Sequence, residues 1–320
     1  MNQVFKVKIM NENYYVVLAG GIGAAKLIKG LAEVVKPELL KIIVNTGDDI
    51  ELFGLKICPD LDIITYTLAN LVDREKGWGF ANETFNCLNI LKKYYDTGWF
   101  SVGDKDLATH IYRTELFNEG FNKAEITNLI CKRLGVKSNL LPMCNESVET
   151  FITTPSGTMH FEEFFIKYQC KPKILKVEFK GIEEAVPVEG ILGYIEKAKK
   201  IIVCPSNPIV SIGTILQVKG IKKALSQVKE KVFAISPIIE GASVKGPADK
   251  LMECIGLEVS CVGVARFYKE FLGHYIIDNR DFNLKPKIEA LGIKTYLFDT
   301  IMTNLRKKIE LAQFVLNLKI

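Results

Sequence analysis

The sequence predicts an α/β protein with a Rossmann-like, mostly parallel sheet and helices on both of its faces. Short β-branched runs alternate with helical patterns along most of the chain. Many of these runs end in glycine, serine, asparagine or aspartate, as strands do where they meet a ligand-binding loop. The 320 residues are 48% hydrophobic and 25% charged, which provides for a large core and excludes a disordered chain.

The N-terminal elements predict one βαβ unit. A strand over 14–18 is followed by the glycine-rich run 19–23, and then by a helix over 24–35. Pro37 ends this helix, and a second strand follows over 41–44. We expect the connection between the two parallel strands to be right-handed.

The middle of the chain is predicted to be an insertion, 61–180, inside a single domain of 14–320. Its patterns indicate a smaller subdomain of helices followed by a β-hairpin. The expected helices cover 83–94 (with Asn82 as cap), 107–117 (with Asp106 as cap) and 123–134; the hairpin pairs 148–153 with 159–166, and 174–179 adds a strand.

Parallel strands return in the last third of the chain. They are followed by polar turns such as Pro205-Ser206-Asn207-Pro208, and a long helix ends the chain. The expected strands are 201–203, 232–235, 275–277 and 295–298, and the expected helix is 301–316.

Composition excludes several classes of function. The net charge of +5 is not gathered in long basic runs, so we expect no nucleic-acid partner and only a local need for anionic ligands. No stretch of about 18 apolar residues predicts a membrane span, and residues 1–13 do not resemble a secretory signal. Eight cysteines without a C-x-x-C pair suggest reduced thiols in a cytoplasmic protein.

The run AGGIGAAK is the first candidate for a phosphate site. Its glycines, Gly20, Gly21 and Gly23, allow backbone amides to face an anion at a helix N-terminus, and Lys26 adds a cation. The spacing fits neither G-x-G-x-x-G nor the Walker A motif. A tight turn without a ligand explains the run about equally well.

Acidic residues follow the second strand. Asn45-Thr46-Gly47-Asp48-Asp49 places two adjacent carboxylates beside the glycine run, which suits Mg²⁺ with a phosphate ligand. A surface turn is the alternative. Asp60 and Asp62 begin the next helix, where Asp60 is equally well placed as a cap.

Two further polar groups stand out. Ser206, Asn207 and Ser211 offer hydroxyls and an amide before a helix, and suit a phosphate or a nucleobase. His110 and Arg113 follow Gly103-Asp104-Lys105-Asp106 on a predicted helix; a general-base role for His110 competes with a structural one.

Taken in order, these segments resemble the CofD family of 2-phospho-L-lactate transferases. The likeness runs from about Val16 to about Met302. It is carried by LAGGIGAAKLIKGL, by VNTGDDIELFGLKICPDLDIITYTLANLVDREKGWGFANETF, by WFSVGDKDLATHIYRT, by LPMCNESVETFITTPSGTMHFEEFFI, by PSNPIVSIGTIL and by SPIIEGASVKGPADKLM.

The resemblance implies a late step in making the deazaflavin coenzyme F-420. The ribityl hydroxyl of the deazaflavin FO would attack the lactyl-bearing phosphate of a lactyl-diphospho-guanosine donor, releasing GMP, with Mg²⁺ as cofactor. A cytoplasmic homodimer with small-molecule substrates is implied as well. Which acyl group the donor carries, whether lactyl, enolpyruvyl or glyceryl, stays open.

The resemblance also implies roles for single residues. Asp48 and Asp49 match the acidic pair near the transferred phosphate, and are the candidate catalytic and metal residues. The candidates to bind FO are Asp60, Asp62, Lys105 and Trp78. Trp78 is included because FO is flat and needs an apolar slot. The candidates for the nucleotide and its phosphates are Gly20, Gly21, Gly23, Lys26, Asn45, Thr46, Ser206, Asn207, Pro208 and Ser211.

The chain departs from the family pattern at three places. Lys105 stands where many members have Arg, Cys144-Asn145-Glu146 where an Asp-Asp pair is common, and Glu240 where Gly is frequent. The related YvcK-like proteins, which bind nucleotide sugars and act in regulation, remain the alternative. A dinucleotide-dependent oxidoreductase is less consistent with the glycine spacing.

Overall fold

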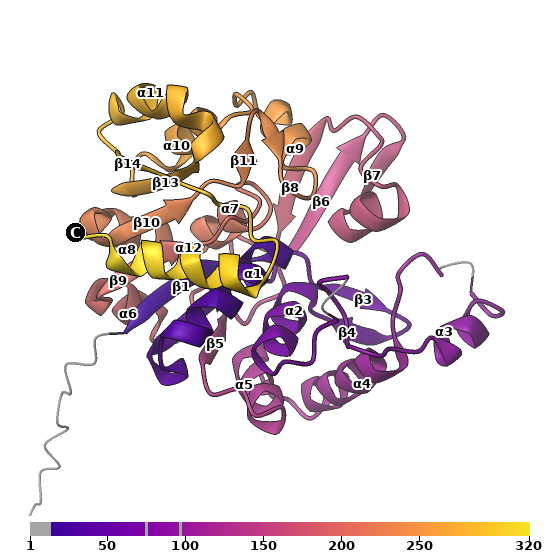
Figure 1. Ribbon diagram of the computed structural model, residues 1–320. Coiled ribbons are helices and arrows are strands. Elements are labelled where there is room, and N and C mark those ends of the chain that lie inside the picture. Colours follow the sequence, from indigo (N-terminus) through magenta and orange to yellow (C-terminus); the bar gives the residue numbers. More distant parts are fainter. Residues whose placement is uncertain (1–13, 74–75, 96–97) are drawn as a thin grey trace, which may run out of the picture.

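The structure is a computed structural model that describes residues 14–73, 76–95 and 98–320. Its core is a seven-stranded parallel sheet (Figure 1). Every pair of neighbouring strands in it is parallel, as predicted. The order is β14-β13-β10-β9-β1-β2-β5, with bounds β1 Tyr15–Ala19, β2 Leu40–Val44, β5 Asn139–Pro142, β9 Lys200–Val203, β10 Val232–Ile235, β13 His274–Asp278 and β14 Lys294–Phe298.

Strand β1 lies at the switch point of the sheet. The chain runs from β1 to β2 and β5 on one side, and returns to β9, β10, β13 and β14 on the other. In open α/β sheets, ligands bind beyond the carboxyl ends of the strands at such a point. The loops after β1, β2 and β9 therefore flank the expected site.

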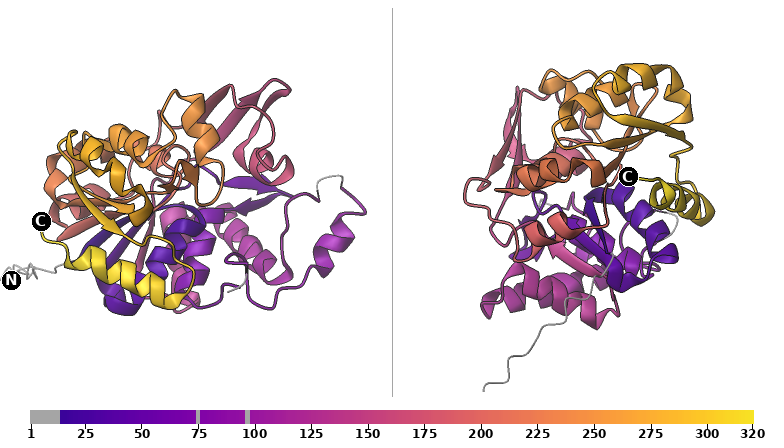
Figure 2. Two further views of the ribbon diagram at one scale, coloured as in Figure 1. Left: turned by 45° about the horizontal axis from the view of Figure 1, so that its top comes forward. Right: turned by 90° about the vertical axis from the view of Figure 1, so that its left-hand side faces the viewer.

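Helices cover both faces of this sheet, as the fold class predicts. Val17 and Ala19 of β1 face one buried cluster, while Val16 and Leu18 face the other. Helix α12 lies along α1 on the first face (Figure 2). The helices on that face are α1 Gly21–Val34, α2 Pro59–Leu68 and α12 Leu305–Asn317. The helices on the opposite face are α6 Ile191–Lys197, α7 Ile212–Gln217, α8 Ile221–Gln227, α9 Ala248–Cys254, α10 Cys261–Tyr268 and α11 Lys285–Glu289.

Smaller units lie beside the main sheet. A helical arm and a three-stranded antiparallel sheet, β7-β6-β8, stand on its right-hand side in Figure 1. The arm holds α3 Asn86–Leu91, α4 Asp104–Asn118 and α5 Lys123–Arg133; the small sheet holds β6 Glu149–Thr154, β7 Gly157–His160 and β8 Lys176–Lys180; two hairpins are β3 Ile50–Leu52 with β4 Leu55–Ile57, and β11 Ile238–Ile239 with β12 Ala242–Ser243.

The segment 61–180, expected as an insertion, also contributes to the core. Strand β5 lies within it and pairs with β2 at the edge of the main sheet. Leu61 and Ile64 of α2 are buried against α1 and the sheet. The strand was missed because Asn139–Pro142 is short and ends in proline.

The second strand of the predicted hairpin, 159–166, is partly wrong. Strand β7 ends at His160, and Glu163–Lys167 form a π-helix. Phe161 and Phe164 are both buried. Their spacing of three suits one face of a helix, so the apolar run could not distinguish the two structures.

The predicted start of the helix over 83–94 is also wrong. Asn82 has a φ of 53°, whereas a capping residue is extended, and α3 begins only at Asn86. The first amides of α3 instead donate to Asp104: Asn86 N to Oδ2 (3.0 Å) and Cys87 N to Oδ1 (3.0 Å). The cap thus comes from a residue distant in sequence.

Two other helix starts differ from the expectation. Helix α1 begins at Gly21, so the glycine run is its first turn. Helix α4 begins at Asp104 with Gly103 at the cap position, and Asp106 lies inside its first turn.

The expectation about a secretory signal concerns residues 1–13, which lie outside the described residues. Among the described helices, none is long and apolar enough to cross a membrane.

Candidate active site at the carboxyl edge of the sheet

The loops after β1 and β9 touch at the switch point. The Gly20 amide donates to Ser206 Oγ at 3.3 Å, and Gly20 is also next to Ser211. A Cβ on Gly20 would lie 2.7 Å from Ser211 Cβ, so a side chain there has no room. The structure therefore brings together Gly20, Ser206 and Ser211, as the sequence predicts.

Gly21 and Gly23, the other two glycines of the run, make different contacts. Gly21 has a φ of +71°, and its amide donates to Asp60 Oδ1 at 2.6 Å. A Cβ on Gly23 would lie 2.3 Å from the Pro205 carbonyl oxygen. The glycine run thus allows the loops after β1 and β9 to pack closely, and the Gly21 amide already donates a hydrogen bond to Asp60. The next amides of α1 have no intrahelical partner by geometry and form the positive end of the helix.

Two lysines lie close enough together for their charges to interact. Lys26 is on α1, and Lys245 comes from the loop between β12 and α9. Burial and then the charge of Lys26 lower the pKa of Lys245. Neither lysine has an acidic partner within the part of the chain that the structure describes, so together they favour an anion at this place.

Asn45 joins two carboxylates at the end of β2. Its amide nitrogen donates to Asp48 Oδ2 (3.1 Å) and to Asp60 Oδ2 (3.0 Å), and its oxygen accepts from the Gly47 amide (3.0 Å). Asn45 is completely buried. Its side chain is therefore a link between the acids, although the sequence had assigned it to the nucleotide.

The acids of this edge repel one another. Burial, and then the charges of Asp60 and Glu162, raise the pKa of Asp48 well above its usual range. Burial raises the pKa of Asp60 to about 6, against the hydrogen bonds from Asn45 and Gly21. Burial and Asp60 raise the pKa of Glu162 to about 8. Such an accumulation of negative charge favours a positive ligand.

Glu162 is a site residue that sequence reasoning missed. It lies two residues after the end of β7 at His160, and it is 7% exposed. His160 places this turn beside the acid pair: its Nδ1 accepts from the Glu162 amide (3.1 Å), and its Nε2 lies 3.1 Å from the Asp49 carbonyl oxygen. An acid within the aromatic run HFEEFF was the available signal.

The residues Asp48 and Asp49 fit a divalent cation. Asp48 Oδ1 and Asp49 Oδ1 are buried and make no hydrogen bond of normal length with the described residues, although the nearby Thr150 hydroxyl lowers the pKa of Asp48 somewhat. Mg²⁺ uses one or two carboxylates together with substrate oxygens and water. The second oxygen of Asp49 is engaged elsewhere, at 2.7 Å from Lys123 Nζ.

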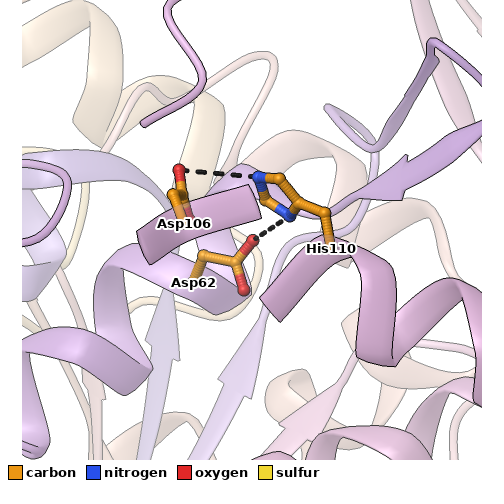
Figure 3. Close-up of side chains that lie close together, drawn as sticks. All are labelled: Asp62, Asp106 and His110. Carbon is orange, nitrogen blue, oxygen red and sulfur yellow. Dashed lines mark ion pairs between the residues drawn. The ribbon is translucent and has the colours of Figure 1, made fainter. Parts of the chain in front are cut away.

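Asp62 is not brought into this site. It points to α4, where both of its oxygens accept from the Arg113 guanidinium. Figure 3 shows His110 between Asp62 and Asp106, with Nδ1 3.8 Å from Asp62 Oδ2 and Nε2 3.5 Å from Asp106 Oδ2. These three could hold a metal by distance alone, but Arg113 Nη1 lies 3.1 Å from His110 Nδ1 and supplies the positive charge.

Lys105 and Trp78 lie on the arm. Lys105 Nζ donates to the carbonyl oxygens of Ala81 (2.8 Å) and Asn82 (2.6 Å). Trp78 is 41% exposed and lines a small hollow together with Phe80 and Asp106. The roles of these residues toward FO stay predictions.

Other predicted nucleotide residues shape the loops. Thr46 is buried, with its hydroxyl 3.9 Å from Cys144 Sγ. Asn207 Oδ1 accepts from the amides of Ile209 (2.9 Å) and Val210 (3.3 Å), and so fixes the turn that contains Pro208. A contact of these side chains with a nucleotide stays a prediction.

The fold and the site define a class: an α/β protein that places clustered carboxylates and a helix N-terminus at the switch point of a parallel sheet, as enzymes acting on phosphorylated ligands do. Comparison with known families narrows this class. The profile described as 2-phospho-L-lactate transferase CofD matches residues 15–308, so the chain belongs to the CofD family and is a transferase.

Individual relatives agree with this family. The 2-phospho-L-lactate transferase of Methanosarcina acetivorans is 39% identical over 303 residues, which are 95% of this chain and 98% of the relative. The phosphoenolpyruvate transferase of Streptomyces griseus is also 39% identical, over an alignment of 313 positions that covers 94% of this chain and 98% of the relative. A crystal structure of a upf0052 family member from Bacillus halodurans matches with a TM-score of 0.63, 18% identity and coverage of 95% and 99%. That likeness supports the fold alone.

Proposed function

We propose that this protein transfers a phospholactyl or related phosphoacyl group from a guanosine diphosphate-linked donor to FO in coenzyme F-420 biosynthesis. The ribityl hydroxyl oxygen of FO forms a bond to the acyl-bearing phosphorus, the bond from that phosphorus to the GMP oxygen breaks, and the hydroxyl proton is released. The observation that carries the proposal is the group of buried, mutually repelling acids beside the N-terminus of α1 at the switch point.

The residues divide between the two substrates. The positive end of α1, Lys26 and the turn containing Ser206 would hold the diphosphate. Asp60, fixed by the Gly21 amide and by Asn45, would accept hydrogen bonds from hydroxyls of the acceptor. Asp60 lies near the start of α2 and Tyr66 near its end, where the Tyr66 hydroxyl donates to Asp106 at the hollow beside Trp78 (2.7 Å). FO would lie along this direction.

A Mg²⁺ ion held by Asp48 and Asp49 would neutralise negative charge on the phosphates during transfer. The protein's own contribution is to keep these acids close and poorly solvated. Asn45 prevents Asp48 and Asp60 from moving apart, and His160 fixes the backbone of Asp49. Phosphoryl transfer depends chiefly on such positioning and charge neutralisation.

The acyl group of the donor stays open in this proposal. Relatives named 2-phospho-L-lactate transferase and phosphoenolpyruvate transferase are equally similar to this chain, at 39% identity each. Overall similarity therefore does not favour one donor. A homodimer in the cytoplasm is part of the proposal, and light scattering should give about twice the chain mass of 35.9 kDa.

The experiment is to incubate the purified protein with FO, Mg²⁺ and each of the lactyl, enolpyruvyl and glyceryl donors in turn, and to measure GMP. We expect GMP and the matching FO phosphodiester to appear in equal amounts with one preferred donor. Asp48→Asn is the control, and should form neither. A YvcK-like regulatory protein would bind the nucleotide and release no GMP with any donor, which would contradict the proposal.

A further inference from the structure

Lys123 is a buried lysine that the proposed reaction has not yet used. It is the first residue of α5, its residue surface is 6% exposed, and its side chain reaches the loop after β2. Nζ lies 2.7 Å from Asp49 Oδ2 and 3.4 Å from the Glu146 carbonyl oxygen. A helix of the arm thus supplies a full positive charge to the acid pair.

The position of Lys123 is fixed by the start of α5. Asn122 and Glu125 form a capping box, in which Asn122 Oδ1 accepts from the Glu125 amide (3.0 Å) and Glu125 Oε2 accepts from the Asn122 amide (2.9 Å). The Ala124 amide also donates to Asn145 Oδ1 at 3.0 Å. The lysine therefore reaches Asp49 from a rigid base rather than from a loose loop.

The two acids of the pair have unequal partners. Asp48 accepts from the neutral amide of Asn45, and within the described residues no lysine or arginine forms an ion pair with it. Asp49 shares its charge with Lys123, and only Oδ1 is left without a bond of normal length. A cation placed beside Asp49 would also be repelled by the lysine.

We propose that Lys123 is a positioning residue that makes the acid pair unequal, so that Asp48 is the principal carboxylate for the divalent cation and Asp49 is largely withheld from it. This inference rests on the cation of the proposed function. It predicts that the second acid becomes a strong ligand as soon as the lysine charge is removed.

The test is Mn²⁺ binding to the full chain without substrates, followed by electron paramagnetic resonance. Asp48→Asn should weaken binding at least about tenfold, and Asp49→Asn by less than about threefold. Lys123→Met, which is neutral and of similar length, should tighten binding about threefold or more. Adding Asp49→Asn to Lys123→Met should abolish that gain, and Lys123→Arg should keep the parental affinity.

Two results would overturn the inference: equal losses in Asp48→Asn and Asp49→Asn, or a Lys123→Met variant that binds Mn²⁺ no more tightly than the parent. The first comparison holds even where Lys123→Met does not fold, which circular dichroism reports. Lys132→Met, at an exposed lysine of the same helix, is the matched control and should leave Mn²⁺ binding unchanged. A parent that binds no Mn²⁺ removes both this inference and the cation of the proposed function, whereas GMP release tests the transfer itself.

Discussion

Asp60 and Asp62 stand two residues apart on α2, and they face two different regions of the molecule. Asp60 belongs to the carboxyl edge of the sheet, where its neighbours are Asn45, the Gly21 amide and further acids. Asp62 belongs to the contact between α2 and α4, where its neighbours are Arg113 and His110. Both acids are buried, at 6% and 5% exposure.

The difference between the two regions lies in charge compensation. At the Asp62 side, the guanidinium of Arg113 offsets the carboxylate. Burial lowers the pKa of Arg113, but the charge of Asp62 opposes this and the pKa is raised above its usual value. At the Asp60 side, the described residues place acids against acids, with Lys123 engaged by Asp49. Proteins satisfy their buried charges where these serve stability, and leave them unsatisfied where a ligand completes the set.

The largest effect is expected from Asp62→Ala. Removing the carboxylate leaves Arg113 as a buried, unpaired charge, so the free energy of unfolding should fall by about 3–5 kcal/mol. Urea unfolding measures the loss, and kcat per folded molecule should stay near that of the parent. A loss below about 1 kcal/mol would show that the Asp62 region does not support the fold as described.

Asp48→Asn should act on the reaction instead. The variant keeps the shape of the side chain but loses the charge that holds a cation, and kcat should fall about 10²- to 10³-fold. Calorimetric affinity for GDP should change by less than about threefold. A variant with normal kcat and weakened GDP binding would assign Asp48 to the nucleotide.

The glycine run offers a prediction of intermediate size. Gly23→Ala places a Cβ 2.3 Å from the Pro205 carbonyl oxygen, so the free energy of unfolding should fall by about 2–3 kcal/mol. At Gly21 a Cβ would meet Asp60 Oδ1 at an ordinary contact distance of 4.0 Å, but φ is +71°, so Gly21→Ala should cost about 1 kcal/mol. Urea unfolding of the two variants side by side checks the order, which would be reversed if φ strain dominated.

Glu162→Gln should change stability by an amount that depends on pH. The pKa of Glu162 is raised to about 8, so the folded chain binds this proton more tightly than the unfolded chain. The contribution of Glu162 to stability is therefore complete below pH about 4.3 and is lost as the pH rises through about 8.

Glutamine cannot ionise, so Glu162→Gln should gain roughly 1–3 kcal/mol of stability relative to the parent between pH 5 and pH 8. Urea unfolding of the variant and the parent at pH 5 and pH 8 measures this difference in stability. Glu163→Gln, at the partly exposed neighbouring acid, is the control and should show no such dependence. A constant difference between Glu162→Gln and the parent would place Glu162 outside the group of repelling acids.

Much of the fold was predictable because its signals are local. The strands around the switch point have β-branched runs that end in glycine or aspartate, and these signals predicted β1, β2 and β9 with their loops. The contact between Gly20 and Ser206 follows from that topology. The cap that Asp104 gives to α3 depends on a distant residue, which no local pattern contains.

The candidate site was predictable only in part. Asp60 and Asp62 were grouped because they are close in sequence, although residues two apart on a helix do not share a face. Lys123 was missed because its partner, Asp49, is 74 positions away in the chain and its own surroundings are those of a solvated helix start. Charge compensation is a property of the tertiary contacts, so the division between the two regions required the structure.

The most direct test of this division measures kcat and the free energy of unfolding for Asp60→Asn and Asp62→Asn in parallel. We expect a crossed result. Asp60→Asn should lose at least about tenfold in kcat with unfolding free energy unchanged or slightly raised, because it removes a repelled charge. Asp62→Asn should lose stability and keep kcat per folded molecule. If both variants lost activity alike and kept their stability, the two acids would belong to one site, and the separation of the two regions would be contradicted.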